Sequence, residues 1–271
     1  MLQYWWLLPV GLLVGTYGTM IGAGGGFLLV PLLLLAFPKD NPETITSIAL
    51  AVVFFNATSG SAAYARKGRV DYRSGLIFAL ATVPGSILGA LATKYVPRHQ
   101  FDILFGLLLL LMGGYLMVKP SKRRAEGEHT ASAGGYQRTV VEADGTTHQF
   151  AYNLPVGVAL SVVVGFISSL LGIGGGIIHV PALSGLLNFP VHIATATSHF
   201  VLAIMALTGT LVHVATGAFH HGVRRTAVLA VGVLIGAPLG AKLSDRLKSD
   251  SIIRSLALAL VLVGVRLLMT G

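Results

Sequence analysis

The sequence predicts an all-α, polytopic membrane protein made of two tandem repeats, and three observations lead to this fold class. Hydrophobic residues make up 54% of the 271 residues and charged residues only 11%, whereas a soluble domain carries about a quarter charged residues. Apolar runs of membrane-spanning length recur, as in Ile103–Val118, Ala227–Leu243 and Ile252–Leu268. A glycine-rich stretch of the first half returns in the second half.

The repeat is visible in order and spacing. Gly15–Pro31 reads GTYGTMIGAGGGFLLVP, and Gly165–Pro181, 150 positions later, reads GFISSLLGIGGGIIHVP. Downstream, Thr46-Ser47 matches Thr197-Ser198, and Gly85-x-x-x-Gly89 matches Gly236-x-x-x-Gly240. Chance similarity between apolar helices would not keep these residues in one order. The chain therefore divides into an N-terminal repeat (1–118), a polar linker (119–153) and a C-terminal repeat (154–271).

Each repeat contains five apolar segments. The first two of each repeat are too long together for one straight crossing, and a glycine triplet separates them. They form either two short helices or one helix broken in mid-membrane, so eight or ten full crossings both stay open. The segments are Trp5–Met20, Gly24–Phe37, Thr44–Ala65, Arg73–Tyr95 and Phe101–Val118, then Leu154–Leu171, Gly174–Leu187, Ala194–Thr216, Arg224–Leu243 and Ser251–Met269.

The linker is the only long polar stretch. Its part Thr139–Tyr152 alternates in polarity around Asp144-Gly145, a pair that favours a type I′ turn. We expect a small exposed β-hairpin that can be deleted without loss of the fold. A linker without fixed structure is the alternative.

Basic residues indicate the orientation. The loop with Arg66, Lys67, Arg69 and Arg73 and the basic start of the linker lie two segments apart, hence on the same, cytoplasmic side. If each repeat crosses the membrane an odd number of times, the repeats are inverted, with Lys242 inside and Arg224 outside; an even number reverses this. The charge difference favours inversion slightly, and inverted repeats are a recurrent transporter plan.

The glycine triplets Gly24–Gly26 and Gly174–Gly176 are the main candidates for a binding site. Three glycines inside a membrane helix cost about 0.8–1 kcal/mol each relative to alanine. They make sense if the backbone unwinds there and the next helix starts inside the membrane, with free N–H groups and its positive dipole end exposed. Such an end binds anions. Close helix packing is the competing explanation.

Acidic residues are absent from the middle of the segments. A cation carrier would be expected to hold an intramembrane carboxylate, so cation transport is disfavoured. Asp71 directly precedes a segment and is interpreted as a helix N-cap rather than a ligand. The ten acidic residues are Asp40, Glu43, Asp71, Asp102, Glu126, Glu128, Glu142, Asp144, Asp245 and Asp250.

Hydroxyl and imidazole groups occupy the segment interiors instead. Most such hydroxyls bond back to their own helix, but the Thr-Ser pairs at matching places are candidates for a substrate shell. Histidine is the group suited to carry a proton near neutral pH, although a buried histidine is often only structural. The substrate-site candidates are Thr46, Ser47, Thr197, Ser198 and His199, and the proton-coupling candidates are His199, His179 and His213.

Several function classes are disfavoured. Without cysteine there is no disulfide or thiolate metal site, and His220-His221 lack the spacing and third ligand of a metal site. We expect no metal and no cofactor. An enzyme would need an intramembrane base, which the segments do not offer. The net charge of +9 lies in short loops, where it orients a membrane protein rather than binding nucleic acid.

At these residues the sequence resembles the TauE/SafE family of sulfite exporter-like membrane proteins. The first repeat carries the resemblance in Ile21–Gly26, Thr46-Ser47-Ile48 and the turn Gly68–Tyr72, followed by Pro84-Gly85-x-x-x-Gly89. The second carries it in Gly172–Gly176, Ala196-Thr197-Ser198 and Gly236-Ala237-Pro238-x-Gly240. The first repeat's Val-Asp turn has no clear equivalent at His220–Val223, which puts in doubt a functional role for an acidic group there.

The resemblance implies a carrier of sulfite, sulfonates or related organosulfur anions in the bacterial cytoplasmic membrane, driven by the proton gradient. Its partners would be the small anion and the lipid bilayer. A channel for the same anion, a membrane scaffold and a homodimer stay open as alternatives. The sequence does not name the anion or the direction of transport.

Overall fold

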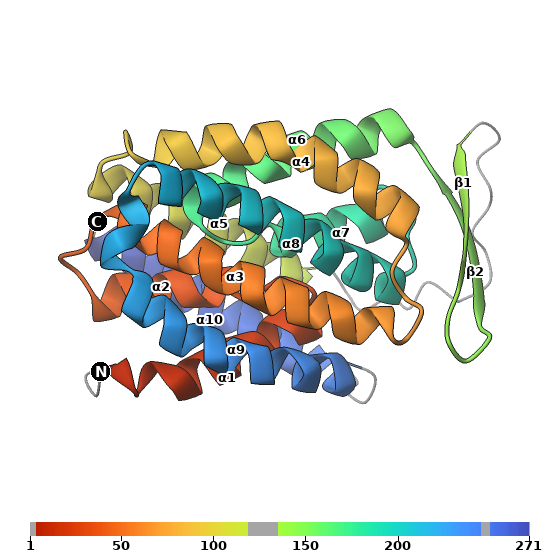
Figure 1. Ribbon diagram of the computed structural model, residues 1–271, viewed down its shortest axis with the longest axis horizontal. Helices are drawn as coiled ribbons and strands as arrows, with labels where there is room; N and C mark the ends of the chain where they lie inside the picture. The colour runs from red at the N-terminus through yellow and green to blue at the C-terminus, as the bar shows by residue number, and fades with distance from the viewer. Residues whose placement is uncertain (1–3, 119–134, 245–249, 271) are drawn as a thin grey trace. The chain divides into compact units, whose positions relative to one another are not determined.

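The computed structural model describes residues 4–118, 135–244 and 250–270, and its described parts are mainly helical (Figure 1). They form two compact units. The larger unit contains α1 (Leu7–Ile21), α2 (Gly26–Ala36), α3 (Pro42–Ala65), α4 (Tyr72–Thr93), β1 (Tyr136–Val141), β2 (Thr147–Tyr152), α6 (Leu154–Leu171), α7 (Gly176–Gly185), α8 (Val191–Ala215), the 3₁₀ helix η2 (Ala218–His221) and α9 (Val223–Leu243). The smaller unit contains α5 (Arg98–Val118) and α10 (Asp250–Thr270).

Five helices of the described chain, α3, α4, α6, α8 and α9, are long and apolar enough to cross a membrane. This confirms the predicted class of helical, multi-pass membrane protein. The helices α1, α2 and α7 are shorter. With 15 residues α1 extends about 22 Å, and with 11 residues α2 extends about 16 Å, both less than the ~30 Å of the hydrocarbon core.

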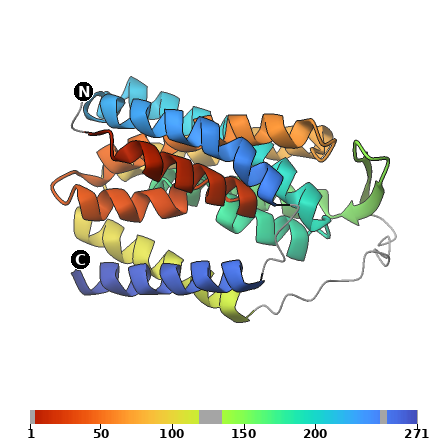
Figure 2. The same cartoon turned by 90° about the horizontal axis from the view of Figure 1, so that it is seen from below.

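The short helices form two helical hairpins, so the glycine triplets separate two helices rather than interrupting one broken helix. The rings of Trp6, just before α1, and Phe37, just after α2, stack at a centroid distance of 6.1 Å, so α2 runs back alongside α1 (Figure 1, Figure 2). In the second repeat, Tyr152 precedes α6 and Phe189 follows α7, and their rings lie 5.0 Å apart. Each glycine triplet is therefore the tip of a helical hairpin.

Glycines let the first helix of each repeat pack against the fourth helix of the other repeat. A methyl group on Gly89 of α4 would lie 2.2 Å from the Phe166 carbonyl oxygen of α6. A methyl group on Gly240 of α9 would lie 2.2 Å from the Thr16 carbonyl oxygen of α1. Small residues at this spacing allow close backbone approach in membranes. The contacts are reciprocal, since α1 packs on α9 and α6 on α4, while α3 packs on α8.

Local sequence explains where the helices begin and end. Asn41 caps α3 by accepting from the Thr44 N–H, and Asn153 caps α6 by accepting from the Val156 N–H. The first helix of each repeat ends on a left-handed glycine, with φ of 84° at Gly22 and 71° at Gly172. Such a residue favours glycine because a Cβ is strained there.

In the smaller unit, α5 and α10 pack on each other through glycine. A methyl group on Gly106 would lie 3.0 Å from the Gly264 carbonyl oxygen, and one on Gly264 would lie 2.9 Å from the Gly106 carbonyl oxygen. On α5, Arg98 and Asp102 form an i,i+4 ion pair at 2.9 Å.

The linker contains an antiparallel β-hairpin in which Thr139 pairs with Gln149. The expected type I′ turn is wrong. Asp144 does not have a positive φ, whereas Gly145 has a φ of 89°, and the Gly145 N–H donates to the Glu142 carbonyl oxygen. This geometry fits a type I turn followed by a left-handed glycine bulge. Asp144 also accepts from the Thr146 N–H at 2.9 Å, which stabilises the longer loop.

Candidate functional site

The two glycine triplets adopt the same unusual backbone. Gly24 and Gly25 have φ values of 75° and 83°, and Gly174 and Gly175 have φ values of 79° and 69°. These left-handed angles reverse the chain between the two helices of each hairpin, and only glycine adopts them without strain. The helices α2 and α7 then start at Gly26 and Gly176.

The tips of the two helical hairpins touch each other. A methyl group on Gly26 would lie 2.5 Å from the Gly172 carbonyl oxygen, and one on Gly176 would lie 2.3 Å from the Gly22 carbonyl oxygen. The contact is thus backbone against backbone and is reciprocal. The N-terminus of α2 meets the C-cap residue of α6, and the N-terminus of α7 meets the C-cap residue of α1.

Side chains brace the first tip. The Asn56 amide donates to the Gly24 carbonyl oxygen at 3.0 Å and accepts from the Thr19 hydroxyl at 3.1 Å. The Tyr64 hydroxyl donates to the Thr19 carbonyl oxygen at 2.9 Å. All three side chains are buried. Asn56 was visible in the sequence as a polar residue inside an apolar segment, but its partner 32 residues away was not.

The predicted hydroxyl groups differ in their surroundings. Thr46 donates to the Pro42 carbonyl oxygen at 2.9 Å, and Ser47 donates to the Thr44 carbonyl oxygen at 2.8 Å, so both bond to their own helix. Thr197 accepts from the Asp71 N–H at 3.0 Å. The buried Ser198 hydroxyl has no hydrogen-bond partner in the described chain.

The structure pairs Thr46 with a different residue from the one that the sequence suggested. A methyl group on Gly172 would lie 3.0 Å from the Thr46 Cα, and one on Gly22 would lie 2.8 Å from the Thr195 Cγ2. The counterpart of Thr46 at the first tip is therefore Thr195 rather than Thr197. The two Thr-Ser pairs match in sequence but do not occupy equivalent places.

The three histidines are fully buried and lie at different places. His199 packs against Gly60 and places its ring edge to face with Tyr64 at 5.5 Å, beside the brace of the first tip. Its Nδ1 lies 3.3 Å from the Thr195 carbonyl oxygen. His179 lies 3.4 Å from the Ser161 hydroxyl and contacts the Phe78 ring. Neither His213 nitrogen has a hydrogen-bond partner among the described residues.

A buried ion pair attaches the β-hairpin to the helical bundle. Asp71 caps α4, as expected, by accepting from the Ser74 N–H, and its side chain is fully buried. The Arg138 guanidinium of β1 donates to it at 2.7 Å. Burial tends to raise the pKa of Asp71, but the hydrogen bonds from Arg138 and Ser74 outweigh burial and hold that pKa below its usual value. No local pattern in the sequence predicts the contact between Arg138 and Asp71.

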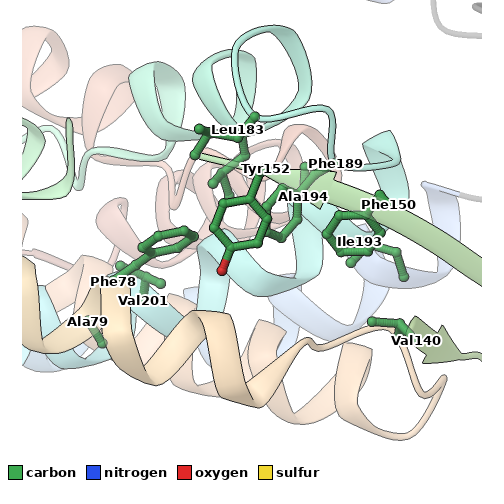
Figure 3. Packing of buried hydrophobic residues seen from close by; sticks show 11 residues of the cluster. Phe78, Ala79, Val140, Phe150, Tyr152, Leu183, Phe189, Ile193, Ala194 and Val201 are labelled. Atoms are coloured by element: carbon green, nitrogen blue, oxygen red, sulfur yellow. The ribbon is translucent and has the colours of Figure 1, made fainter. Parts of the chain in front are cut away.

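Aromatic side chains complete this docking, so the expectation of an exposed hairpin is wrong. Phe150 and Tyr152 of β2 are buried against Phe78 of α4 and Phe189, which precedes α8 (Figure 3). The Phe150 and Phe189 rings lie 4.5 Å apart, and the Tyr152 hydroxyl donates to the Ser74 hydroxyl at 2.7 Å. The alternation in the linker therefore reflects one face that packs on the bundle. Deleting the hairpin would uncover this aromatic cluster.

The described residues offer neither a polar pocket among those found nor a metal site. A pocket of about 280 Å³ lies between α1 and α2, but its lining, from Trp6 to Ala36, is apolar. Among the residues with described positions, no group of three or more His, Cys, Asp or Glu could hold a metal ion. The pocket faces hydrocarbon-like side chains and offers an anion no donors.

Comparison with known proteins identifies the family. The family model described as sulfite exporter TauE/SafE matches residues 7–267. A probable membrane transporter protein, YunE, of Bacillus subtilis is 34% identical over 98% of this chain and 97% of its own length. A probable membrane transporter protein of Xylella fastidiosa is 30% identical over 94% of this chain and 90% of its own. A relative in Methanocaldococcus jannaschii, also named a probable membrane transporter protein, is 22% identical over 97% of this chain. No solved structure matches the chain. The chain, with its two glycine-tipped helical hairpins, belongs to the TauE/SafE family of membrane transporters.

Proposed function

We propose that the protein is a secondary transporter of a small organosulfur anion, sulfite or a sulfonate, in the bacterial cytoplasmic membrane, coupled to the proton gradient. The family match supports the transporter class, and the description of the family supports sulfite as the first anion to test. The observation that supports an anionic substrate is the contact between the two glycine tips, Gly26 against Gly172 and Gly176 against Gly22. Each contact sets the positive N-terminal end of one helix, α2 or α7, against the carbonyl end of the first helix of the other hairpin, and separation of the tips would free both positive ends for an anion.

The proposed site lies at these tips. The backbone N–H groups of Gly25, Gly26, Gly174 and Gly175 would be the main donors. The Gly24 N–H already donates to the Gly18 carbonyl oxygen at 3.1 Å, and the Gly176 N–H to the Gly174 carbonyl oxygen at 2.8 Å, so these two would have to change partner to bind the anion. Among the four hydroxyl candidates, Ser198 ranks first, since Thr46 and Ser47 already donate within their own helix and Thr197 accepts from Asp71. Because the tips touch, the anion would enter when they separate.

We also propose that the two repeats are inverted. The reciprocal packing of α1 on α9 and of α6 on α4 supports a two-fold relation. In Figure 1, α3 runs from left to right and α8 from right to left, which supports an axis in the membrane plane. Each hairpin returns to its starting side, so the first repeat would cross with α3, α4 and α5 and the second with α8, α9 and α10. That is an odd number in each repeat and six crossings in all, in place of the eight or ten expected from the sequence.

The proposed orientation follows from basic residues. The Lys67 ammonium donates to the Ala241 carbonyl oxygen at 2.5 Å, so the end of α9 with Lys242 lies beside the basic loop between α3 and α4. Arg225, at the other end of α9, pairs with Asp40. The positive-inside rule then places the α3–α4 loop, Lys242 and the β-hairpin in the cytoplasm.

Flux in proteoliposomes tests this proposal. Proteoliposomes with the purified protein should accumulate sulfite or a sulfonate against its concentration gradient when a pH gradient is imposed. This accumulation should stop when the pH gradient is collapsed. Flux that only follows the anion's own gradient would identify a channel instead. Absence of binding and flux across sulfite, sulfoacetate, taurine, thiosulfate, sulfate and carboxylates would overturn the proposed substrate class.

A single variant tests the proton coupling. His199 is the first candidate, because it lies beside the braced tip and its Nε2 has no hydrogen-bond partner in the described part of the chain. We expect His199→Gln to bind the anion while its transport loses the dependence on the pH gradient. Unchanged coupling in this variant would transfer the role to His179 or His213.

A further inference from the structure

The two glycine tips have corresponding sequences, but one residue at the base of each tip differs. Gly18 of α1 corresponds to Ser168 of α6, 150 positions later. A methyl group on Gly18 would lie 2.4 Å from the Gly25 nitrogen, so α1 packs directly against the start of α2. No side chain fits between them. In the second repeat a hydroxyl group occupies this place.

The Ser168 hydroxyl is buried and points at the start of α7. It is the atom nearest to a methyl group placed on Gly175, the residue that precedes α7, at 2.6 Å. Its side chain is fully buried, and it has no hydrogen-bond partner among the described residues. Ser161, two turns earlier in α6, instead donates to the Gly157 carbonyl oxygen at 2.8 Å, the usual arrangement for a serine in a membrane helix.

The polar groups of the first tip are already used. Asn56 donates to the Gly24 carbonyl oxygen and accepts from Thr19. The residue 149 positions after Asn56, the offset that also relates Thr46 to Thr195 and Gly60 to Gly209, is Met205, which cannot replace this amide. One tip is thus braced by a side chain, and the other has a buried hydroxyl without a partner.

We propose that the transported anion binds on one side of the tip contact, at the N-terminus of α7, and that the Ser168 hydroxyl donates a hydrogen bond to it. This inference rests on the proposed anion transport and assigns the site to the second repeat. A buried hydroxyl without a partner destabilises the folded protein. A bound oxyanion accepts from Ser168 and from the Ile177 N–H of the first turn of α7, since the neighbouring Gly176 and Ile178 N–H groups already donate to the Gly174 and Gly175 carbonyl oxygens. The first tip serves as the fixed support.

The test compares two neighbouring serines in the full-length protein. Ser168→Ala removes the proposed donor. Ser169→Ala is the matched control, because the Ser169 hydroxyl already bonds to Ser86 at 2.7 Å. Binding of sodium sulfite and, separately, of sulfoacetate is measured by calorimetry, and the apparent Tm is measured without anion. A hydrogen bond to a charged group contributes about 1.5–3 kcal/mol, so S168A should bind about 10- to 100-fold more weakly.

The two variants should change anion affinity and thermal stability in opposite ways. S168A should have an apparent Tm equal to or above that of the wild type, with weaker binding, whereas S169A should have a lower Tm and wild-type affinity. Equal affinity of S168A and wild type would overturn the inference and leave the transport proposal standing. Absence of binding by the wild type would instead contradict the proposed function. If S168A does not fold, Ser168→Cys, which keeps the volume and weakens the donor, decides in the same way.

Discussion

The two helical hairpins offer a comparison within one molecule. The α1–α2 and α6–α7 hairpins have the same glycine angles and touch through equivalent atoms, Gly26 to Gly172 and Gly176 to Gly22. Their surroundings differ. The first tip is braced by Asn56, and the second has the unpartnered Ser168. Duplication has kept the backbone and changed the polar side chains, so backbone geometry and ligand chemistry are separable in this fold.

The open ends of the hairpins differ as well. Phe37, just after α2, lies under the Arg225 guanidinium, whose carbon is 3.9 Å from the centroid of the Phe37 ring. Arg225 also pairs with Asp40. Phe189, after α7, is covered by Phe150 and Tyr152 of the β-hairpin. One end is closed by a single cation and the other by an added pair of strands. The two hairpins thus differ both at the tip and at the open end.

The largest loss of stability is expected from substitutions in the backbone contact that the two tips share. Gly26→Ala and Gly176→Ala each place a methyl group within 2.5 Å of a backbone atom of the other tip. We expect each to lower stability by about 3 kcal/mol or more, because overpacking against backbone leaves little room to adjust. Apparent Tm and the yield of monodisperse protein measure this. Gly114→Ala, which meets nothing within 4 Å, is the control and should be tolerated. A large loss for only one tip would show that the contact is not reciprocal.

The next effect concerns the covered end of the second repeat. Arg138→Ala leaves the buried Asp71 carboxylate without its cation and should cost about 3 kcal/mol at pH 7. Thr139→Ala, an exposed neighbour on β1, should cost little.

The pH dependence sharpens this prediction. The pKa of Asp71 is lowered in the folded wild type, so the stability it contributes is present above its ordinary pKa of about 3.9 and is lost as the pH falls through the folded value. In Arg138→Ala, protonation of Asp71 removes the cost of the unpaired carboxylate. The difference in Tm between the two proteins should therefore shrink from pH 7 toward pH 4. A constant difference would mean that Arg138 acts through packing alone.

A smaller effect is expected at the brace of the first tip. Asn56→Ala leaves the Gly24 carbonyl oxygen and the Thr19 hydroxyl without the amide, which should cost about 1–3 kcal/mol. Met205→Leu, at the corresponding position, conserves volume and should cost less than about 1.5 kcal/mol. Thermal unfolding compares them. If both cost the same, the Asn56 brace is not what distinguishes the tips.

The smallest effect on stability is expected for the hydroxyl groups of α3 and α8. Ser47→Ala removes a bond to the Thr44 carbonyl oxygen of its own helix, so stability should change by about 0.5 kcal/mol or less and anion affinity should be unchanged. Ser198→Ala removes a hydroxyl without a partner in the described chain and should leave Tm equal or higher. Weaker sulfite binding by Ser47→Ala would restore that residue to the site.

Some of this arrangement follows from local sequence. The glycine triplets predict a break, because three glycines weaken a helix and permit left-handed angles, and the caps at Asn41 and Asn153 follow the usual residue preferences. That the tips touch depends on how the two repeats associate, which no local pattern determines. The β-hairpin followed from Asp144-Gly145, but its docking did not, because Arg138 and Asp71 are 67 residues apart. Likewise, counting residues aligned Thr46 with Thr197, and only the contacts with Gly22 and Gly172 corrected it.

The contact between the tips has a mechanical consequence. Gly26 and Gly176 have no Cβ, so each meets the opposite carbonyl oxygen without interlocking side chains. Two smooth surfaces of this kind can slide past one another with little steric resistance, whereas pulling them apart uncovers the ends of four helices at once. A push of one hairpin toward the other therefore acts directly on main-chain atoms, whereas a displacement along the contact meets no interlocked side chain.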